Sequence, residues 1–343
     1  MKTAAILGAS GYTGAEMIRL ALAHPKLNLV ALTGRSRAGE SAAAVHPGFR
    51  GRDLPDLQTL DDVDWSDIDV AFACLPHGAS EETVARILPH VETVIDLSAD
   101  FRLRDAGLYE RTYGREHSNP DLLSEAVYGL SEWARDDLPG AKLVACPGCF
   151  PTCALLGLAP LLEAELVSPE VSISALTGVT GAGRKALEAF SFSEVNDSVH
   201  PYGLAGHRHA PEMDQFFDRN TSQDVTVGFV PHLVPMNRGM VTTSFVELSG
   251  ATVGDLRDAL ERRYTDAPFV EVLPPGVAPK TRDVRGSNVC RVNVFADRRD
   301  GRAIVVAAID NLTKGSSGQA VQNYNLTQGW GETLGLEHAP LFP

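Results

Sequence analysis

The sequence predicts an α/β, doubly wound first domain and an α+β second domain with a largely antiparallel sheet. The 343 residues exceed the roughly 100–200 of one ordinary domain. Short apolar runs alternate with helical patterns up to residue 148, and longer strand-like runs with few helices follow. We therefore expect a nucleotide-binding domain over 1–148, a catalytic domain over 149–312, and a C-terminal helix and tail, 313–343, that pack back on the first domain.

In the first domain, buried strands and helices alternate. We expect helices at 15–23 and 80–88 and strands at 2–7, 28–33, 70–75, 91–97 and 142–146. Strands this apolar are typical of a parallel sheet whose two faces are both covered by crossover helices. The pattern indicates a Rossmann-type domain.

The second domain is richer in strands than in helices. Leu256, Leu260 and Tyr264 lie at helical spacing and predict a helix over 254–264. The polar segment 310–328 predicts a closing helix. Strands are expected at 171–176, 225–234, 240–248, 288–296 and 303–309.

Composition and charge exclude several classes of function. Acidic residues number 44 and basic residues 30, a formal charge of −14, which disfavours a nucleic-acid or anionic-membrane surface. The longest apolar stretch, 153–162, is far shorter than the roughly 20 residues of a membrane span. The N-terminus lacks the features of a secretory signal. We expect a cytoplasmic protein that acts on a small molecule and has no nucleic-acid or membrane partner.

The first strand runs into a glycine-rich turn with the spacing G-x-x-G-x-x-G, and a helix follows. Glycines at such a turn let the backbone approach a dinucleotide pyrophosphate at the helix N-terminus. A purely structural turn is the alternative. The expected cofactor contacts here are Gly8, Ser10, Gly11, Tyr12, Thr13 and Gly14.

The end of the second strand indicates which nicotinamide cofactor is used. NAD enzymes usually carry Asp or Glu there to bind the ribose 2'-hydroxyl. This strand instead ends in Thr33-Gly34-Arg35-Ser36-Arg37, and guanidinium groups form strong paired bonds to phosphate. The sequence therefore predicts NADP(H) with Arg35 and Ser36 on its 2'-phosphate. The alternative is a solvated basic face.

A cysteine at a strand-to-helix junction is the candidate nucleophile. The strand at 142–146 is followed by Pro147-Gly148-Cys149-Phe150-Pro151, and we expect Pro151 to be the first helical residue. A helix N-terminus lowers the pKa of a nearby thiol, which favours the thiolate of Cys149. We expect Cys153 and Cys74 to be core residues.

Cys146 and Cys149 also form a C-x-x-C pair, to which His207 and His209 could add two zinc ligands. A chain of this length needs no metal to fold, so we expect neither a metal site nor a thioredoxin-like pair.

His209 is the candidate acid/base residue. It precedes Pro211, which we expect to begin a helix, and Glu212 in its first turn could orient an imidazole or bind a polar substrate group. The alternative is an exposed basic loop.

A second glycine-rich turn spans 177–185 and offers backbone donors and two cations, Arg184 and Lys185, to an anion. Its candidate ligand contacts are Gly178, Gly181, Ala182 and Lys185.

Ordered blocks along the whole chain resemble the N-acetyl-gamma-glutamyl-phosphate reductase family of arginine biosynthesis, within the semialdehyde dehydrogenase group. The blocks lie at 8–14, 75–78, 96–102, 147–152, 177–185, 207–212, 231–239, 284–288 and 309–315. The resemblance implies that Cys149 attacks an acyl phosphate to form a thioester and that His209 is the acid/base residue. It also implies NADPH as hydride donor and a homo-oligomer, dimer or tetramer. By the same resemblance, Leu75, Pro76, Gly78 and Asn311 contact the cofactor, and Arg102 binds the phosphate of the substrate. We also expect Ser98 to contact the cofactor, and Lys185 and Glu212 to contact the substrate.

The sequence departs from the family pattern at two positions. Cys146 replaces the usual Asn, which bears on a substrate hydrogen bond, and Phe150 replaces the usual Tyr. A similar reductase acts on a carrier-protein-linked glutamyl or aminoadipyl phosphate, but segments 150–152 and 178–185 fit the acetylated substrate better. A redox sensor that binds NADP without turnover is the rival from another functional class.

Overall fold

The computed structural model describes residues 1–184, 186–204 and 206–342. It divides into two compact units, Met1–Pro147 with Ser316–Glu337 and Gly148–Gly315 with His338–Pro343. The boundary near residue 148 lies one residue from the expected one. The C-terminal segment differs more from the expectation that all of 313–343 packs on the first domain. Only 316–337 belong to the first unit, whereas the residues just before and just after this range belong to the second.

Seven parallel strands form the sheet of the first unit, in the order β3-β2-β1-β4-β5-β7-β6. Their bounds are β1 Lys2–Leu7, β2 Leu27–Thr33, β3 Leu57–Gln58, β4 Val70–Ala73, β5 Thr93–Asp96, β6 Val127–Tyr128 and β7 Leu143–Ala145. The strand order reverses between β1 and β4. Ligands of such sheets bind at this point, outside the carboxyl ends of the strands.

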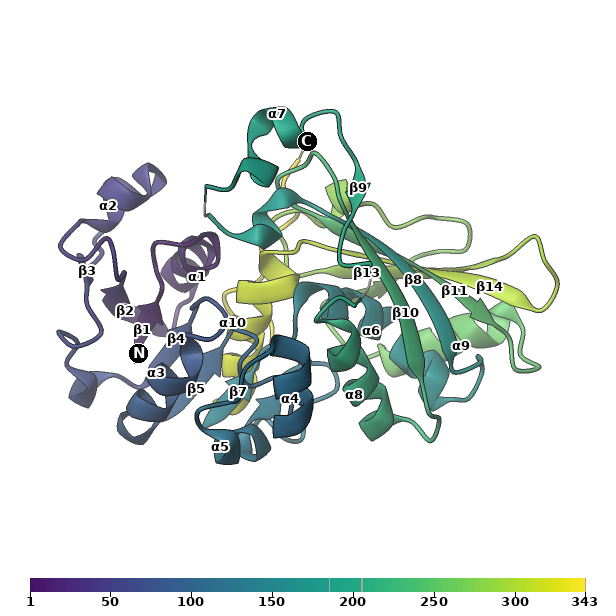
Figure 1. The fold of residues 1–343 in the computed structure, drawn as a ribbon, viewed down its shortest axis with the longest axis horizontal. Coiled ribbons are helices and arrows are strands. Elements are labelled where there is room, and N and C mark those ends of the chain that lie inside the picture. Colours follow the sequence, from purple (N-terminus) through teal and green to yellow (C-terminus); the bar gives the residue numbers. More distant parts are fainter. Residues whose placement is uncertain (185, 205, 343) are drawn as a thin grey trace. The chain divides into compact units, whose positions relative to one another are not determined.

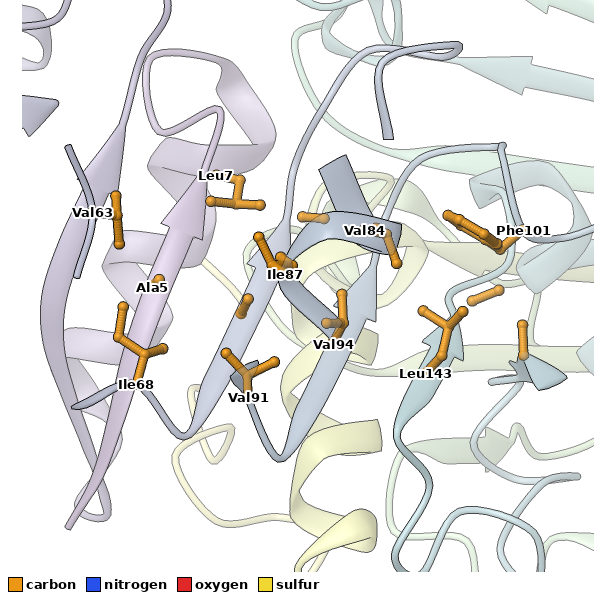
Figure 2. Packing of buried hydrophobic residues seen from close by; sticks show 14 of the residues in the cluster. Ala5, Leu7, Val63, Ile68, Val84, Ile87, Val91, Val94, Phe101 and Leu143 are labelled. Atoms are coloured by element: carbon orange, nitrogen blue, oxygen red, sulfur yellow. The ribbon is translucent and has the colours of Figure 1, made fainter. Parts of the chain in front are cut away.

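The helices of the first unit are α1 Tyr12–Ala23, α2 Ala42–Val45, α3 Ser80–Ile87, α4 Ala106–Tyr113, α5 Pro120–Glu125 and α10 Gly318–Thr327. Figure 2 shows Val84 and Ile87 of α3 packed over Leu7 and Val94 of the sheet. The strands β4, β5 and β7 are buried at every residue, which confirms a parallel sheet covered on both faces.

The closing helix begins later than its polar pattern predicts. The carboxylate of Asp310 accepts the N–H groups of Leu312 and Thr313, at 2.8 and 3.0 Å, and the N–H of Gly315 donates to the carbonyl of Asp310. This bonding produces a π-helical turn at Thr313–Ser317 before α10 starts.

The second unit holds a mixed sheet in the order β12-β13-β14-β11-β8-β10-β9. Its strands are β8 Glu170–Thr177, β9 His200–Pro201, β10 Thr226–Leu233, β11 Met240–Glu247, β12 Val270–Val272, β13 Cys290–Ala296 and β14 Arg302–Ile309. The pairs β8–β10 and β12–β13 are parallel, and the other pairs are antiparallel. The sheet is therefore largely antiparallel, as expected.

Three longer helices pack on one face of this sheet, α6 Cys149–Glu163, α8 Ala210–Asn220 and α9 Val253–Arg263 (Figure 1). The short helix α7 spans Phe192–Val195. In the described ranges, no helix is both long and apolar enough to cross a membrane.

Candidate active site

Cys149 is the first residue of α6, and Gly148 is its N-cap. The expectation that Pro151 begins this helix is wrong, because Gly148 already has the extended cap conformation and its carbonyl accepts the N–H of Thr152 at 2.9 Å. The half-buried thiol therefore lies at the positive end of a helix of 15 residues. This position favours the thiolate.

The other cysteines of this region have a different environment. Burial raises the pKa of both Cys146 and Cys153 to about 12. The thiol of Cys153 donates to the carbonyl of Ala307 at 3.3 Å, in the core beneath α6. In the part of the chain that the structure describes, no group of three or more His, Cys, Asp or Glu residues could hold a metal.

His209 is the N-cap of α8 and is 6% exposed. Ala210 begins the helix, so Pro211 is its second residue and not, as expected, its first. A β-carbon built on Gly148 would lie 2.5 Å from Nε2 of His209. The imidazole therefore lies directly against the residue that precedes Cys149.

Glu212 lies in the first turn of α8 and is fully buried. Its Oε1 accepts the N–H of Gly148 at 2.8 Å. A buried carboxylate needs such donors to offset its lost hydration. The structure thus gives Glu212 a contact that the sequence did not predict, to the backbone beside the nucleophile, while substrate binding by Glu212 stays a prediction.

His207 supports this arrangement. Its Nδ1 accepts the N–H of His209 at 3.2 Å, and its ring centroid lies 4.8 Å from that of His209. Burial, with a smaller contribution from the charge of Arg208, lowers the pKa of His207 to about 4. At neutral pH His207 is therefore a neutral hydrogen-bond acceptor.

Sequence reasoning missed two residues that border Cys149. A β-carbon on Gly315 would lie 2.7 Å from Cβ of Cys149, so the turn after β14 closely approaches the nucleophile. The ring of Tyr202 lies edge-on to that of His207, with centroids 5.6 Å apart, and its pKa is raised by burial and, to a smaller extent, by the charge of Cys149. The block 309–315 was a signal for Gly315, whereas Tyr202 stands in no block.

The second glycine-rich turn does not offer the row of backbone donors that was expected. The N–H groups of residues 178, 179 and 180 donate to the carbonyls of Gly239, Met236 and Asn237, and that of Gly181 donates back to Gly178. Cofactor contacts by Gly178, Gly181 and Ala182 remain predictions. They would have to be van der Waals contacts of the backbone with the cofactor and not hydrogen bonds from the amides already used within the chain. Lys185 lies outside the described residues.

Asn311 fastens this turn. Its Oδ1 accepts the N–H of Gly239 at 2.9 Å, and its Nδ2 donates to the hydroxyl of Thr180 at 3.0 Å. Both ends of the amide therefore bind within the second unit, and a cofactor contact by Asn311 stays a prediction.

In the first unit, the three glycines of the first turn have separable roles. Gly8 has a φ of +73°, and a β-carbon on it would collide with the carbonyl of Cys74. A β-carbon on Gly14 would lie 2.5 Å from the carbonyl oxygen of Gly8, within the first turns of α1. A β-carbon on Gly11 would meet only ordinary contact, at 3.5 Å. A side chain at position 11 would therefore not clash with the chain itself, and Ser10, Tyr12 and Thr13 around the N-terminus of α1 are at least partly exposed.

The two arginines after β2 differ in their surroundings. Arg37 pairs with Glu40 at 2.5 Å. Arg35 and Ser36 are exposed, and Arg35 has no hydrogen bond or ion pair within the described ranges. Arg35 is thus the better placed cation for an incoming phosphate.

The loops at the carboxyl ends of β4 and β5 are held by two buried carboxylates. Asp100 accepts the N–H of Gly78 at 2.8 Å and that of Ser80 at 2.9 Å. Asp96 accepts the hydroxyl of Ser98 at 2.7 Å, and burial raises the pKa of Asp96 to about 6. These bonds fix the backbone of 75–80, the segment expected to contact the cofactor through Leu75, Pro76 and Gly78.

Arg102 is 7% exposed. Its Nε donates to the carbonyl of Cys146 at 2.8 Å, and its Nη2 donates to that of Leu97 at 3.1 Å. These bonds hold the strand ends of the first unit together. The substrate contact expected of Arg102 stays a prediction.

The chain matches two family descriptions that together span most of its length: "Semialdehyde dehydrogenase, NAD binding domain" over residues 3–141 and "Semialdehyde dehydrogenase, dimerisation domain" over residues 149–311. An N-acetyl-gamma-glutamyl-phosphate reductase of Afipia carboxidovorans is 50% identical over 99% of this chain and 98% of its own length. This chain belongs to the N-acetyl-gamma-glutamyl-phosphate reductase family.

Other relatives agree with this family. The N-acetyl-gamma-glutamyl-phosphate reductase of Rhodospirillum rubrum is 48% identical over 99% of this chain and 98% of its own length. A probable chloroplastic member from Arabidopsis thaliana is 48% identical over 98% of this chain and 84% of its own length.

The fold recurs in a solved structure outside the reductase family. Aspartate semialdehyde dehydrogenase II of Vibrio cholerae has a TM-score of 0.74 at 18% identity, covering 95% of this chain and 98% of that one. At that identity the likeness concerns the fold alone, which confirms the expected pairing of a parallel-sheet unit with a mixed-sheet unit.

Proposed function

We propose that this protein reduces N-acetyl-L-glutamyl 5-phosphate with NADPH to N-acetyl-L-glutamate 5-semialdehyde and phosphate. The observation that carries the proposal is the placement of Cys149 at the N-terminus of α6 with the imidazole of His209 against Gly148. Acyl transfer to sulfur requires a thiolate nucleophile and a nearby group that can take up and return a proton. The 50% identity to a reductase of this name supports the choice of substrate.

In the proposed mechanism, His209 takes the proton of the Cys149 thiol. The Sγ then attacks the acyl carbon, the bond from that carbon to the phosphate oxygen breaks, and His209 returns the proton to the departing phosphate. N–H groups of the first turn of α6 stabilise the negative oxygen of the tetrahedral state. Glu212 keeps the Gly148 backbone in place throughout.

NADP(H) fits the residues of the first unit. The glycine turn leads into the N-terminus of α1, which suits a pyrophosphate, and the exposed Arg35 suits a 2'-phosphate. When bound, NADPH supplies the hydride that turns the Cys149 thioester into the aldehyde. Cys149 then leaves as the thiolate, which restores the enzyme.

Substrate identity is tested in the reverse direction. Purified protein is given NADP+, inorganic phosphate and either N-acetyl-L-glutamate 5-semialdehyde or L-aspartate semialdehyde, and the NADPH absorbance is followed. We expect a much larger kcat/KM for the acetylated compound. Tight NADP+ binding without turnover of either compound would instead support a redox sensor.

We also propose a homo-oligomer, dimer or tetramer, built on the open face of the second sheet. The helices cover the opposite face, and Phe245, Ile304, Val230 and Val306 stay wholly or partly exposed on the open one. Apolar side chains left exposed together on a sheet face are typical of a subunit interface. Analytical ultracentrifugation should give the mass of a dimer or a larger assembly, and Phe245→Glu should lower the mass of that assembly.

We place the reaction in the cytoplasm. The similarity to bacterial reductases such as that of Afipia carboxidovorans supports this placement. Expression as a fluorescent fusion in a bacterial host, followed by fractionation, tests this placement.

A further inference from the structure

The segment that follows β2 carries Arg35 and is fastened to β3 on one side. The N–H of Gly39 donates to the carbonyl of Leu57 at 2.6 Å, and the N–H of Leu57 donates to the carbonyl of Glu40 at 2.9 Å. Beyond this anchor the chain forms α2, in which Ala42 and Val45 are buried. The segment is therefore held at its middle, and α2 sets the position of the residue after it.

That residue is His46, and it reaches the glycine-rich turn. Its Nε2 lies 2.9 Å from the carbonyl oxygen of Ala9. A carbonyl oxygen can only accept, so Nε2 carries the hydrogen. Ala9 is fully buried, and its N–H donates to the carbonyl of Thr33 at 2.8 Å, so the acceptor is firmly placed. The rings of His46 and Phe49 pack in a T-shaped arrangement, with centroids 5.9 Å apart.

The bond joins two parts of the chain that one dinucleotide would bridge. In folds of this class the pyrophosphate lies on the glycine turn and the adenine ribose lies at the end of the second strand. Ala9 belongs to the first of these places, and the segment with Arg35 belongs to the second. Their relative position decides whether Arg35 meets a 2'-phosphate.

We propose that His46 is a positioning residue for NADP, whose Nε2–H bond to Ala9 aligns the 2'-phosphate segment with the pyrophosphate turn. The proposal rests on the NADP use proposed above. It concerns affinity for the phosphorylated cofactor and leaves the chemistry at Cys149 untouched.

The loss of one neutral hydrogen bond predicts a measurable change in cofactor preference. His46→Leu should raise the Kd for NADP+ about threefold to tenfold, with a smaller change for NAD+, which lacks the 2'-phosphate. At saturating NADPH, kcat should stay within about twofold of wild type, because no catalytic group is altered. His46→Gln should restore NADP+ affinity, since its amide nitrogen can reach the position of Nε2.

The experiment is calorimetric titration of wild type, His46→Leu and His46→Gln with NADP+ and with NAD+. His90→Leu, an exposed histidine after α3, is the matched control and should match wild type. If His46→Leu does not fold, His46→Phe takes its place with the same expected result. Equal losses for both nucleotides, or equal losses in the Leu and Gln variants, would overturn the proposal.

These titrations need no acyl phosphate, so they separate this inference from the proposed reaction. A protein that binds NADP+ but never turns over the acetylated substrate would refute the reaction and still test His46. Wild-type protein that binds neither nucleotide would overturn both.

Discussion

The imidazole of His209 occupies the space that a side chain would need at Gly148, because a β-carbon there would lie 2.5 Å from Nε2. Glu212, three residues further along, binds the N–H of the same glycine at 2.8 Å. Two residues at the start of α8 thus contact Gly148: His209 lies where its side chain would be, and Glu212 binds its backbone N–H. A change at Gly148 is expected to disturb the nucleophile and the acid/base residue together.

Gly148→Ala should therefore cost activity without loss of the fold. The added methyl group must displace His209, so kcat should fall about 100-fold, the usual share of a positioned acid/base group. Steady-state kinetics with saturating NADPH measure this. Gly331→Ala is the control, because a β-carbon at Gly331 meets nothing within 4 Å. Wild-type kcat in Gly148→Ala would show that His209 does not act from its present place.

The two histidines before α8 should respond differently to the same substitution. His209→Asn removes the acid/base group and should lower kcat by roughly 100-fold or more. His207→Asn should be milder, since the amide oxygen can still accept the N–H of His209 that Nδ1 accepts at 3.2 Å. Parallel kcat measurements decide, and a larger loss in His207→Asn would transfer the role to His207.

Stability should depend on pH through Asp96. Burial raises its pKa to about 6, above the ordinary 3.8, so the folded protein holds this proton more tightly than the unfolded chain. The stabilising contribution of the protonated Asp96 to the free energy of unfolding is fully present below pH 3.8 and is lost as the pH rises through about 6. Asp96→Asn cannot titrate at this position, so only the wild type should lose this stability as the pH rises. The thermal midpoint of Asp96→Asn minus that of wild type should therefore increase from pH 5 to pH 8. A constant difference would contradict this assignment.

Cofactor preference should depend on Arg35 far more than on Arg37. A charge-assisted bond to phosphate is worth about 1.5–3 kcal/mol, so Arg35→Ala should narrow the preference for NADP over NAD by roughly tenfold to a hundredfold. Arg37→Ala should have little effect, because Arg37 already pairs with Glu40. Michaelis curves for both nicotinamides test this, and equal effects of Arg35→Ala on NADP and NAD would refute it.

The fold was largely predictable because its signals are local. Alternating apolar runs and turn residues located β1 at Lys2–Leu7 without error and placed α3 and β11 to within one residue at each end. The closing helix was not predictable to this accuracy, because Asp310 binds the N–H groups of Leu312 and Thr313 and delays its start.

At the candidate site, the sequence located the reactive side chains but not the contacts between them. The positions of Cys149 and His209 at two helix starts follow from strand ends and prolines nearby in the chain. The bond from Glu212 to Gly148 spans 64 residues and depends on how α6 and α8 pack, which no local pattern encodes. The same reason hid the approach of Gly315 to Cys149.

The Cys149 thioester is the central claim, and peptide mass spectrometry tests it most directly. Protein is mixed with N-acetyl-L-glutamyl 5-phosphate in the absence of NADPH, quenched in acid and digested. Wild type and Cys153→Ala should gain one acyl group, located on Cys149 and removed by hydroxylamine, while Cys149→Ser should gain no such thioester because an alcohol is a far weaker nucleophile. An acyl group on another residue, or full reductase activity in Cys149→Ser, would contradict the account.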